Sequence, residues 1–246
     1  MVASASVAGI AGVGALVHAA PGLPGVYPAG MHVVPALHGR GRSGHVALTF
    51  DDGPDPASTP AFLNQLDELG WKATFFMLGT RAREHPTVVV DVVAAGHEVA
   101  VHGDEHRNML RRSPWSARAD VRRGRDTLAE LAGQDPVFFR PPFGTLAFGA
   151  FWGARSSGLT TVLWTNWGRD WRGDASPESV AAEVLARDID GGTVLLHDSD
   201  RQSDPGSWRN ALGALPILAD TLAARGLTVG PLRDHGLRGA RRTARV

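Results

Sequence analysis

The stretch Val-Ala-Leu-Thr-Phe-Asp-Asp-Gly-Pro-Asp, residues 46–55, joins a short apolar run directly to two adjacent carboxylates, Asp51 and Asp52. Val46 to Phe50 has the length and composition of a buried strand. The Gly-Pro-Asp that follows favours a turn. Both carboxylates are therefore expected where a strand ends, on a loop that fixes their direction.

Four further polar clusters follow apolar runs in the same way. They are His-Gly-Asp-Glu-His at 102–106, Arg-Pro-Pro-Phe-Gly at 140–144, Asp-Trp at 170–171 and His-Asp at 197–198. Each lies at or just beyond the C-terminal end of a predicted strand. In α/β proteins the loops at that edge of the sheet carry the binding and catalytic groups. The five clusters are therefore expected to form one site.

From residue 45 onward, strand-like runs alternate with longer amphipathic segments, which indicates repeated βα units around a parallel sheet. Strands are predicted at 45–50, 73–77, 97–101, 137–139, 160–164, 192–196 and 227–229, and helices at 57–69, 86–95, 114–131, 177–187 and 208–225. Three of these helices begin with proline, and Ser176 is a predicted N-cap. The pattern predicts an irregular (β/α)7-type barrel with its site at the C-terminal ends of the strands.

The bulk composition narrows the function. A chain of 246 residues fits one such domain, which we place at 45–232, between an extension and linker at 1–44 and a basic tail at 233–246. The formal net charge is zero, so no global field recruits nucleic acid. With no cysteine, a metal site must use histidines and carboxylates. The sequence gives no indication of the oligomeric state.

Two interpretations of each terminus stay open. Residues 1–39 hold no Lys or Arg, so the apolar run at 2–17 lacks the positive start of a signal peptide. It is either an extension of the domain or a degenerate export or anchor segment. Four arginines occur among the last nine residues, which form either a solvated end or a contact to an anionic polymer. Association with membrane or cell wall through the termini therefore remains a hypothesis.

His102 and His106 are four residues apart, so in a helical turn both imidazoles can reach one metal ion. Two such histidines alone are more often surface or capping residues. A carboxylate from another strand end would complete a two-His-one-carboxylate set, which leaves a coordination position open, as catalytic zinc sites require. Because neighbouring strand residues point to opposite sides, one of Asp51 and Asp52 would bind the metal and the other would face the substrate.

Taken in order, the motifs TFDDGPD, H-x-x-x-H, RPPFG, W-x-x-x-x-x-D-W and LLHD resemble those of the polysaccharide deacetylases, the NodB-homology group or carbohydrate esterase family four. The resemblance covers roughly residues 46–198 and extends to about 229. It implies a metal-dependent hydrolase that removes N-acetyl groups from amino sugars of a polysaccharide or oligosaccharide such as peptidoglycan or chitin. It also favours an extracellular or cell-envelope location.

The resemblance also implies a role for each matched residue. Asp52, His102 and His106 would bind a divalent metal, with zinc expected first and cobalt or another divalent ion as alternatives. Asp51 would be the general base and His197 the general acid, oriented by Arg140 and Asp170 respectively. The Phe143 backbone N–H would hold the oxyanion, and Trp171 and Leu195 would wall the acetyl pocket.

Two departures from the family pattern bear on the site. Gly103 stands where a hydroxyl residue usually braces the second motif, so a Gly103→Ser change would tighten metal binding unless Gly103 has a positive φ. Trp167 replaces a common aspartate and is expected to reshape the groove, whereas Trp152, Trp164 and Trp208 are interpreted as packing residues. Alternative functions are hydrolysis of a small amide or cyclic imide, and non-catalytic carbohydrate binding.

Overall fold

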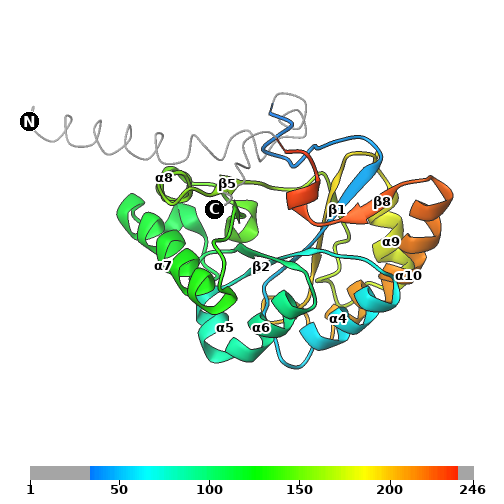
Figure 1. The fold of residues 1–246 in the computed structure, drawn as a ribbon, viewed down its shortest axis with the longest axis horizontal. Coiled ribbons are helices and arrows are strands. Elements are labelled where there is room, and N and C mark those ends of the chain that lie inside the picture. Colours follow the sequence, from blue (N-terminus) through cyan, green and yellow to red (C-terminus); the bar gives the residue numbers. More distant parts are fainter. Residues whose placement is uncertain (1–33, 238–246) are drawn as a thin grey trace, which may run out of the picture.

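The structure is a computed structural model that describes residues 34–237 as a parallel sheet curled into a half-barrel and flanked by helices (Figure 1). The strand order is β5-β4-β3-β2-β1-β7-β6, and β8 pairs with β1. The strands are β1 His45–Asp51, β2 Thr74–Met77, β3 Glu98–Val101, β4 Phe138–Phe139, β5 Thr160–Thr161, β6 Asn166–Trp167, β7 Thr193–His197 and β8 Thr228–Gly230. All the strand pairs are parallel, which confirms the predicted α/β class.

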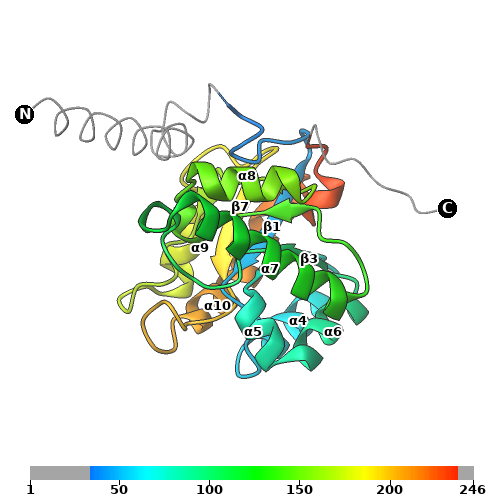
Figure 2. The same cartoon turned by 90° about the vertical axis from the view of Figure 1, so that its left-hand side faces the viewer.

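The five predicted helices are all present, and each begins and ends within two residues of its predicted bounds. They are α4 Thr59–Glu68, α6 Pro86–Ala94, α7 Pro114–Ala132, α9 Pro177–Leu185 and α10 Trp208–Ala224. They cover the outside of the sheet, as Figures 1 and 2 show. Their apolar faces contribute to the core that lies between sheet and helices. Ser176 caps α9 as expected, because its hydroxyl accepts a hydrogen bond from the Ser179 N–H.

Within residues 34–237, two α-helices were not predicted. Helix α5, Gly79–Glu84, is too short to display a periodic apolar face. Helix α8, Phe148–Ser156, contains two glycines, which weaken a helical pattern. Gly149 is required by packing, since a Cβ there would lie 2.2 Å from the Pro114 carbonyl oxygen at the start of α7. Helices α7 and α8 consequently lie side by side (Figure 2).

Strand alternation divides the apolar residues between two cores. On β2, Phe75 packs against the helices while its neighbour Phe76 lies inside the half-barrel. The inner core is small and also contains Ala47, Ala100, Phe138, Val162 and Leu232. The larger outer core lies between the sheet and the helices.

The strand predicted at 160–164 is wrong in one respect: it is split and continues to residue 167. Its first part, β5, pairs with β4, and its last part, β6, pairs with β7 on the opposite side of the sheet. Between them Val162 N–H still bonds to Phe139 O, and Thr165 N–H bonds to Thr193 O. One extended segment therefore bridges the two edges of the curled sheet, so the sheet has eight strands where seven were predicted.

The stretch at 39–44, interpreted from sequence as a linker, contacts the N-terminal end of the barrel. Gly41 N–H donates to Gly191 O, and Arg42 N–H donates to His235 O. His235 also bonds through Nδ1 to the Nδ1 of buried His45 at 2.8 Å. The apolar run at 2–17 and the arginines at 238–245 lie outside the described residues. Within 34–237, no helix is long and apolar enough to span a bilayer.

Candidate active site

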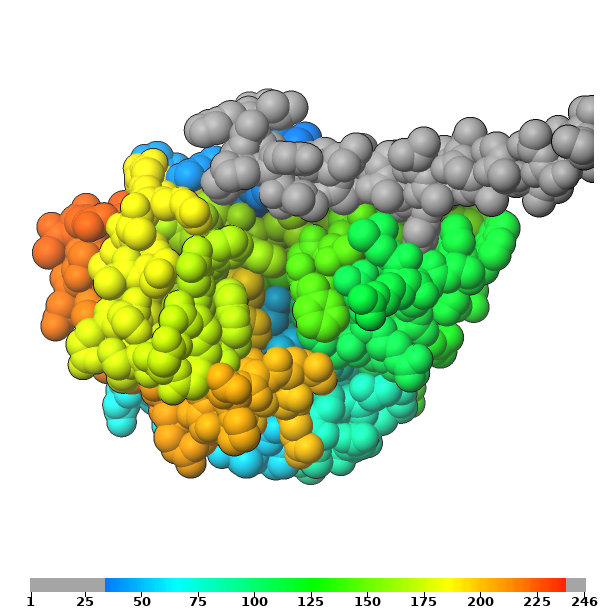
Figure 3. Space-filling view, turned by 180° about the vertical axis from the view of Figure 1, so that it is seen from behind, coloured from blue at the N-terminus to red at the C-terminus, as the bar shows by residue number. Residues whose placement is uncertain are grey.

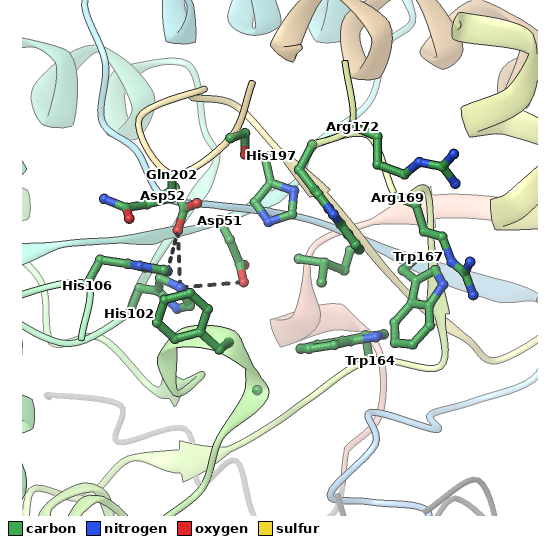
Figure 4. A pocket seen from close by; sticks show the side chains of 15 residues that line it. Asp51, Asp52, His102, His106, Trp164, Trp167, Arg169, Arg172, His197 and Gln202 are labelled. Atoms are coloured by element: carbon green, nitrogen blue, oxygen red, sulfur yellow. Dashed lines mark ion pairs between the residues drawn. The ribbon is translucent and has the colours of Figure 1, made fainter. Parts of the chain in front are cut away.

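A cleft of about 610 Å³ opens at the C-terminal ends of the strands, where the five motifs were expected to meet. It lies in the hollow seen in Figure 3 between the green and the yellow-to-orange parts of the chain. Figure 4 shows its lining side chains. They are Asp51, Asp52, His102, His106, Phe143, Gly144, Trp164, Trp167, Arg169, Trp171, Arg172, Leu195, His197, Gln202 and Ser203.

Asp51 and Asp52 both face this cleft, although adjacent strand residues normally point to opposite sides. The reason is that Asp52 leaves the strand with a φ of +79°, a left-handed conformation that aspartate tolerates better than most residues. The following Gly53 is sterically required, since a Cβ there would lie 2.5 Å from an oxygen of buried Asp198. The turn therefore brings the two carboxylates to one side.

Asp52, His102 and His106 place their ligand atoms around one point. Asp52 Oδ1 lies 3.3 Å from His102 Nε2 and 3.2 Å from His106 Nε2 (Figure 4), and it has no hydrogen-bond partner among the described residues although it is buried. His102 Nδ1 lies 2.9 Å from Arg140 O, and donation to that carbonyl leaves the Nε2 lone pair facing Asp52. A buried, unpartnered oxygen beside two imidazole lone pairs fits a divalent cation.

The charge states also suit a cation. Burial lowers the pKa of His106 to about 4, so this imidazole is neutral at pH 7 and its nitrogen is free to bind a metal. Burial by itself would raise the pKa of Asp52, but the neighbouring His102 and the nearby His197 charge lower it to about 2. Asp52 is therefore an anion.

Arg140 is fully buried inside the half-barrel and contacts Asp51. Its NH1 donates to Asp51 Oδ1 at 2.7 Å and to Thr49 Oγ1 at 2.8 Å, and its NH2 donates to Leu163 O at 2.8 Å. The guanidinium also lies 4.1 Å from the centroid of the Phe76 ring. Leu163 O belongs to the bridging segment between β5 and β6, so Arg140 ties Asp51 to that segment.

His197, at the end of β7, is held by Asp170. One Asp170 oxygen accepts the His197 backbone N–H at 2.7 Å and the other lies 3.1 Å from Nδ1, which leaves Nε2 toward the cleft. Burial opposes the charged imidazolium, but the Asp170 carboxylate outweighs it and raises the pKa of His197 to about 10. The protonated form is thus available to donate a proton.

The three residues expected in the acetyl pocket also line the cleft. Phe143 has a φ of +58°, and its backbone N–H forms no hydrogen bond within residues 34–237. Leu195 is buried, and Trp171 lies edge-on to His197 with ring centroids 5.7 Å apart. The cleft therefore combines a free N–H with apolar walls.

Several residues that line the cleft were not predicted from the sequence. Trp164 was interpreted as packing, but it lines the cleft beside Trp167, with ring centroids 5.8 Å apart (Figure 4). It is the last residue of a predicted strand and the first of the fourth motif, and that position at the site edge was the available signal. Arg169 occupies an unspecified position of the fourth motif, and Arg172, Gln202 and Ser203 lie in loops outside the motifs, so the sequence did not indicate these four residues.

Gly103 has no hydroxyl group with which to hold the loop between the two histidines, and Asp120, from α7, holds this loop instead. Its buried carboxylate accepts the N–H groups of Asp104 at 3.0 Å and Glu105 at 3.3 Å, which form the loop between the two histidines. Gly103 itself has a φ of +97°, and a Cβ there would lie 2.8 Å from Asp120 Oδ2. A serine at this position would therefore be strained, which favours the alternative that Gly103 is needed for its conformation.

Comparisons with known proteins agree with this arrangement. The family model described as "Polysaccharide deacetylase" matches residues 38–162. The chain is 37% identical over 155 residues to a Bacillus cereus peptidoglycan-N-acetylglucosamine deacetylase, covering 62% of this chain and 72% of that protein. It is 33% identical over 196 residues to a Bradyrhizobium chitooligosaccharide deacetylase, covering 76% and 88%.

A solved structure gives the same result. The family 4 carbohydrate esterase from Streptomyces lividans, in complex with acetate, superposes with a TM-score of 0.68 at 34% identity, covering 76% of this chain and 92% of that one.

Proposed function

Because the chain belongs to the polysaccharide deacetylase family, we propose that it is a metal-dependent hydrolase that removes N-acetyl groups from amino sugars of a polysaccharide or oligosaccharide. The observation that carries the proposal is the convergence of a carboxylate base, an imidazolium acid and a three-residue metal set in one cleft. Peptidoglycan and chitin fragments are the substrate classes named for its relatives.

Asp52, His102 and His106 would hold the metal, and zinc is the ion that this donor set fits first. When bound, a divalent ion supplies Lewis acidity, which polarises an amide carbonyl and makes water a better nucleophile. The orphaned Asp52 Oδ1 and the neutral His106 support this assignment. Cobalt or another divalent ion remains an alternative.

Asp51 would take the proton from the attacking water. Its carboxylate is fixed in direction by Arg140, which donates to only one of its oxygens, Oδ1. The second oxygen, Oδ2, remains on the cleft side, 3.8 Å from His102 Nε2. A base must be both oriented and available, and this pairing meets the two requirements.

His197 would give a proton to the departing amine. An amine leaves only as a neutral molecule, because its anion is far too basic, so the acid must be protonated before the C–N bond breaks. Asp170 keeps the proton on His197 and fixes Nδ1, which directs Nε2 at the leaving group.

The Phe143 N–H would donate a hydrogen bond to the oxygen that becomes negative during attack. Leu195 and Trp171 would enclose the acetyl methyl group, for which their apolar surfaces are suited. The other walls, Trp164 and Trp167, offer aromatic faces on which sugar rings can pack.

The test is mass spectrometry of the products formed from peptidoglycan fragments and from chitooligosaccharides. We expect losses of 42 Da per deacetylated sugar, roughly the mass of an acetyl group less one hydrogen, and no product after chelation. Restoration by Zn²⁺ or Co²⁺ would identify competent ions. Full activity in metal-free protein, or no loss of acetyl groups from either substrate, would refute the proposal.

The family points to action at the cell envelope. Contact of the termini with membrane or cell wall is part of the same hypothesis and concerns segments outside the described residues. A fractionation experiment on cells that express the full chain would test it.

A further inference from the structure

A second cavity, of about 490 Å³, adjoins the catalytic cleft and shares His106 and Phe143 with it. Its other lining residues are Arg107, Asn108, Arg111 and Arg112, all in the segment that follows the second histidine. The shared residues mean that a polymer bound in the cleft can continue into this cavity. Three arginines in its wall make it a place for an anion.

The charges of the three arginines are not equally compensated. Arg112 is largely buried and pairs with Asp120 at 2.8 Å, and Arg107 pairs with Glu105 at 2.9 Å. Arg111 is exposed and forms no ion pair within the described part of the chain. It is presented by a 3-10 turn, Met109–Arg111, whose start is capped by the Asn108 side chain. One guanidinium is thus fixed at its base and left without a counter-ion.

On the other side of the cleft, both arginines have acidic neighbours that compensate their positive charge. Arg172 pairs with Asp174, and Arg169 lies 3.7 Å from Glu183. Uncompensated positive charge is therefore concentrated on the side of the second cavity. An asymmetric charge of this kind can select which neighbour of the reacting sugar lies on which side.

Phe143 separates the two cavities. Its side chain is 60% exposed, and its ring lies edge-on to His106 with centroids 4.4 Å apart. A sugar whose acetamide reaches the Asp51–His197 site cannot itself fill the space beyond this ring. Whatever enters the second cavity belongs to the adjacent unit of the polymer.

We propose that this cavity is a subsite for a carboxylate carried by the sugar next to the one that is deacetylated. The inference rests on the proposed deacetylase function and narrows its substrate class to acidic glycans. A planar guanidinium matches a carboxylate with two parallel hydrogen bonds. In a peptidoglycan strand every second amino sugar bears a lactyl ether that ends in a carboxylate or in a peptide with its own carboxylates. Chitin has no such group.

The test compares three tetrasaccharides or fragments of equal glycan length: neutral chitotetraose, a peptidoglycan glycan stripped of peptides, and the same glycan with its peptides. Each is assayed with the wild type and with Arg111→Glu. The matched control is Arg122→Glu, which reverses an exposed arginine of α7 that also forms no ion pair within residues 34–237.

We expect the wild type to have a lower KM for at least one acidic substrate than for chitotetraose, with the difference shrinking as salt is added. Arg111→Glu should raise KM for the acidic substrate by roughly 3- to 10-fold, with kcat nearly unchanged and a much smaller effect on chitotetraose. Arg122→Glu should change none of these values. If the peptide-stripped glycan is preferred over chitotetraose, the group bound in the cavity is the lactyl carboxylate. If only the peptide-bearing glycan is preferred over chitotetraose, the bound group is a carboxylate of the peptide.

Equal effects of Arg111→Glu on neutral and acidic substrates, or no wild-type preference for acid, would overturn the subsite while leaving the deacetylase function intact. Failure of the wild type to deacetylate any of the three would instead refute the deacetylase function, and the subsite with it.

Discussion

At the scale of single residues, Asp51 and Asp52 are neighbours with different partners. Asp51 contacts the guanidinium of Arg140, and Asp52 Oδ1 contacts only imidazole nitrogens. This division gives each carboxylate a separate experimental signature, because in the proposed function Asp51 removes a proton and Asp52 holds a metal ion.

Asp51→Asn should keep the metal and lose a factor of roughly 10² to 10⁴ in turnover, since an amide cannot accept the proton but can still bond to Arg140. Asp52→Ala should lose the metal together with activity. Metal content and rate are measured on folded proteins, with His197→Ala as a comparison that should resemble Asp51→Asn. The opposite pattern, with Asp51→Asn losing metal and Asp52→Ala keeping it, would reverse the assignment.

Asp170→Asn should shift the alkaline limb of the pH dependence of kcat/KM to lower pH. The Asp170 carboxylate raises the pKa of His197, so its removal lets the imidazolium lose its proton at a lower pH. A profile that falls in amplitude without moving would mean that Asp170 only holds the ring in place.

Asp120→Asn should weaken metal binding by ~10-fold, because an amide replaces one of the two oxygens that accept from the His102–His106 loop. Metal affinity is measured by competition with a chelator. Asp126→Asn, an exposed change on the same helix, is the control. Unchanged affinity would show that the loop is fixed by other contacts.

At the scale of elements, the bridging segment at 160–167 determines how Arg140 is held. Arg140 donates to Val162 O and Leu163 O, in the part of this segment between β5 and β6. The arginine is thus part of the barrel closure as well as of the site.

Arg140→Met should destabilise the metal-free protein by about 3–5 kcal/mol, because it leaves the buried Asp51 charge unpaired. The double variant Arg140→Met with Asp51→Asn should recover part of this loss without recovering activity. The free energy of unfolding is measured by denaturant titration of all four proteins. Strictly additive effects of the two changes would mean that the pair does not interact.

The sequence predicted those elements whose signal is local. Asp51 and His197 follow uninterrupted apolar runs, so their place at the strand ends could be read directly. The split at 162–165 could not, because it depends on which strands the segment meets after folding. Asp120 was equally hidden: nothing in the sequence distinguishes it from a surface aspartate of α7, and its partners lie 15 and 16 residues away.

At the scale of the whole molecule, the N-terminal end of the barrel is closed by a buried histidine pair. His235 Nε2 contacts Gly39 O at 3.0 Å and Gly191 O at 3.1 Å, so Nε2 carries the proton and Nδ1 accepts from His45. The pair joins three distant parts of the chain, and its hydrogen bond requires a neutral His235, because a protonated His235 Nδ1 could not accept from His45.

The free energy of unfolding should therefore fall as pH drops from about 6.5 toward 4. Burial lowers the pKa of His235 to about 4 and also lowers that of His45, so the unfolded chain binds these protons more readily. Buried Glu98 has a raised pKa and acts in the opposite direction, so the measured quantity is a difference between proteins.

His235→Gln should flatten this acid-side loss relative to the wild type, and His85→Gln, between α5 and α6, should not. Denaturation midpoints between pH 7 and pH 4 provide the measurement. Parallel curves for wild type and His235→Gln would exclude the pair as a source of acid sensitivity.

The bridging segment has one more consequence, which concerns how mechanical strain would spread through the enzyme. Its carbonyls at 162–163 accept hydrogen bonds from Arg140, which contacts the proposed base, and seven residues later the same run of chain reaches Asp170, which contacts the proposed acid. The groups that orient Asp51 and His197 are thus linked through one continuous length of backbone. Stretching or cutting the backbone between Leu163 and Asp170 is therefore expected to disturb the positions of Asp51 and His197 together. Exchange of a loop elsewhere on the rim of the cleft is not expected to do so.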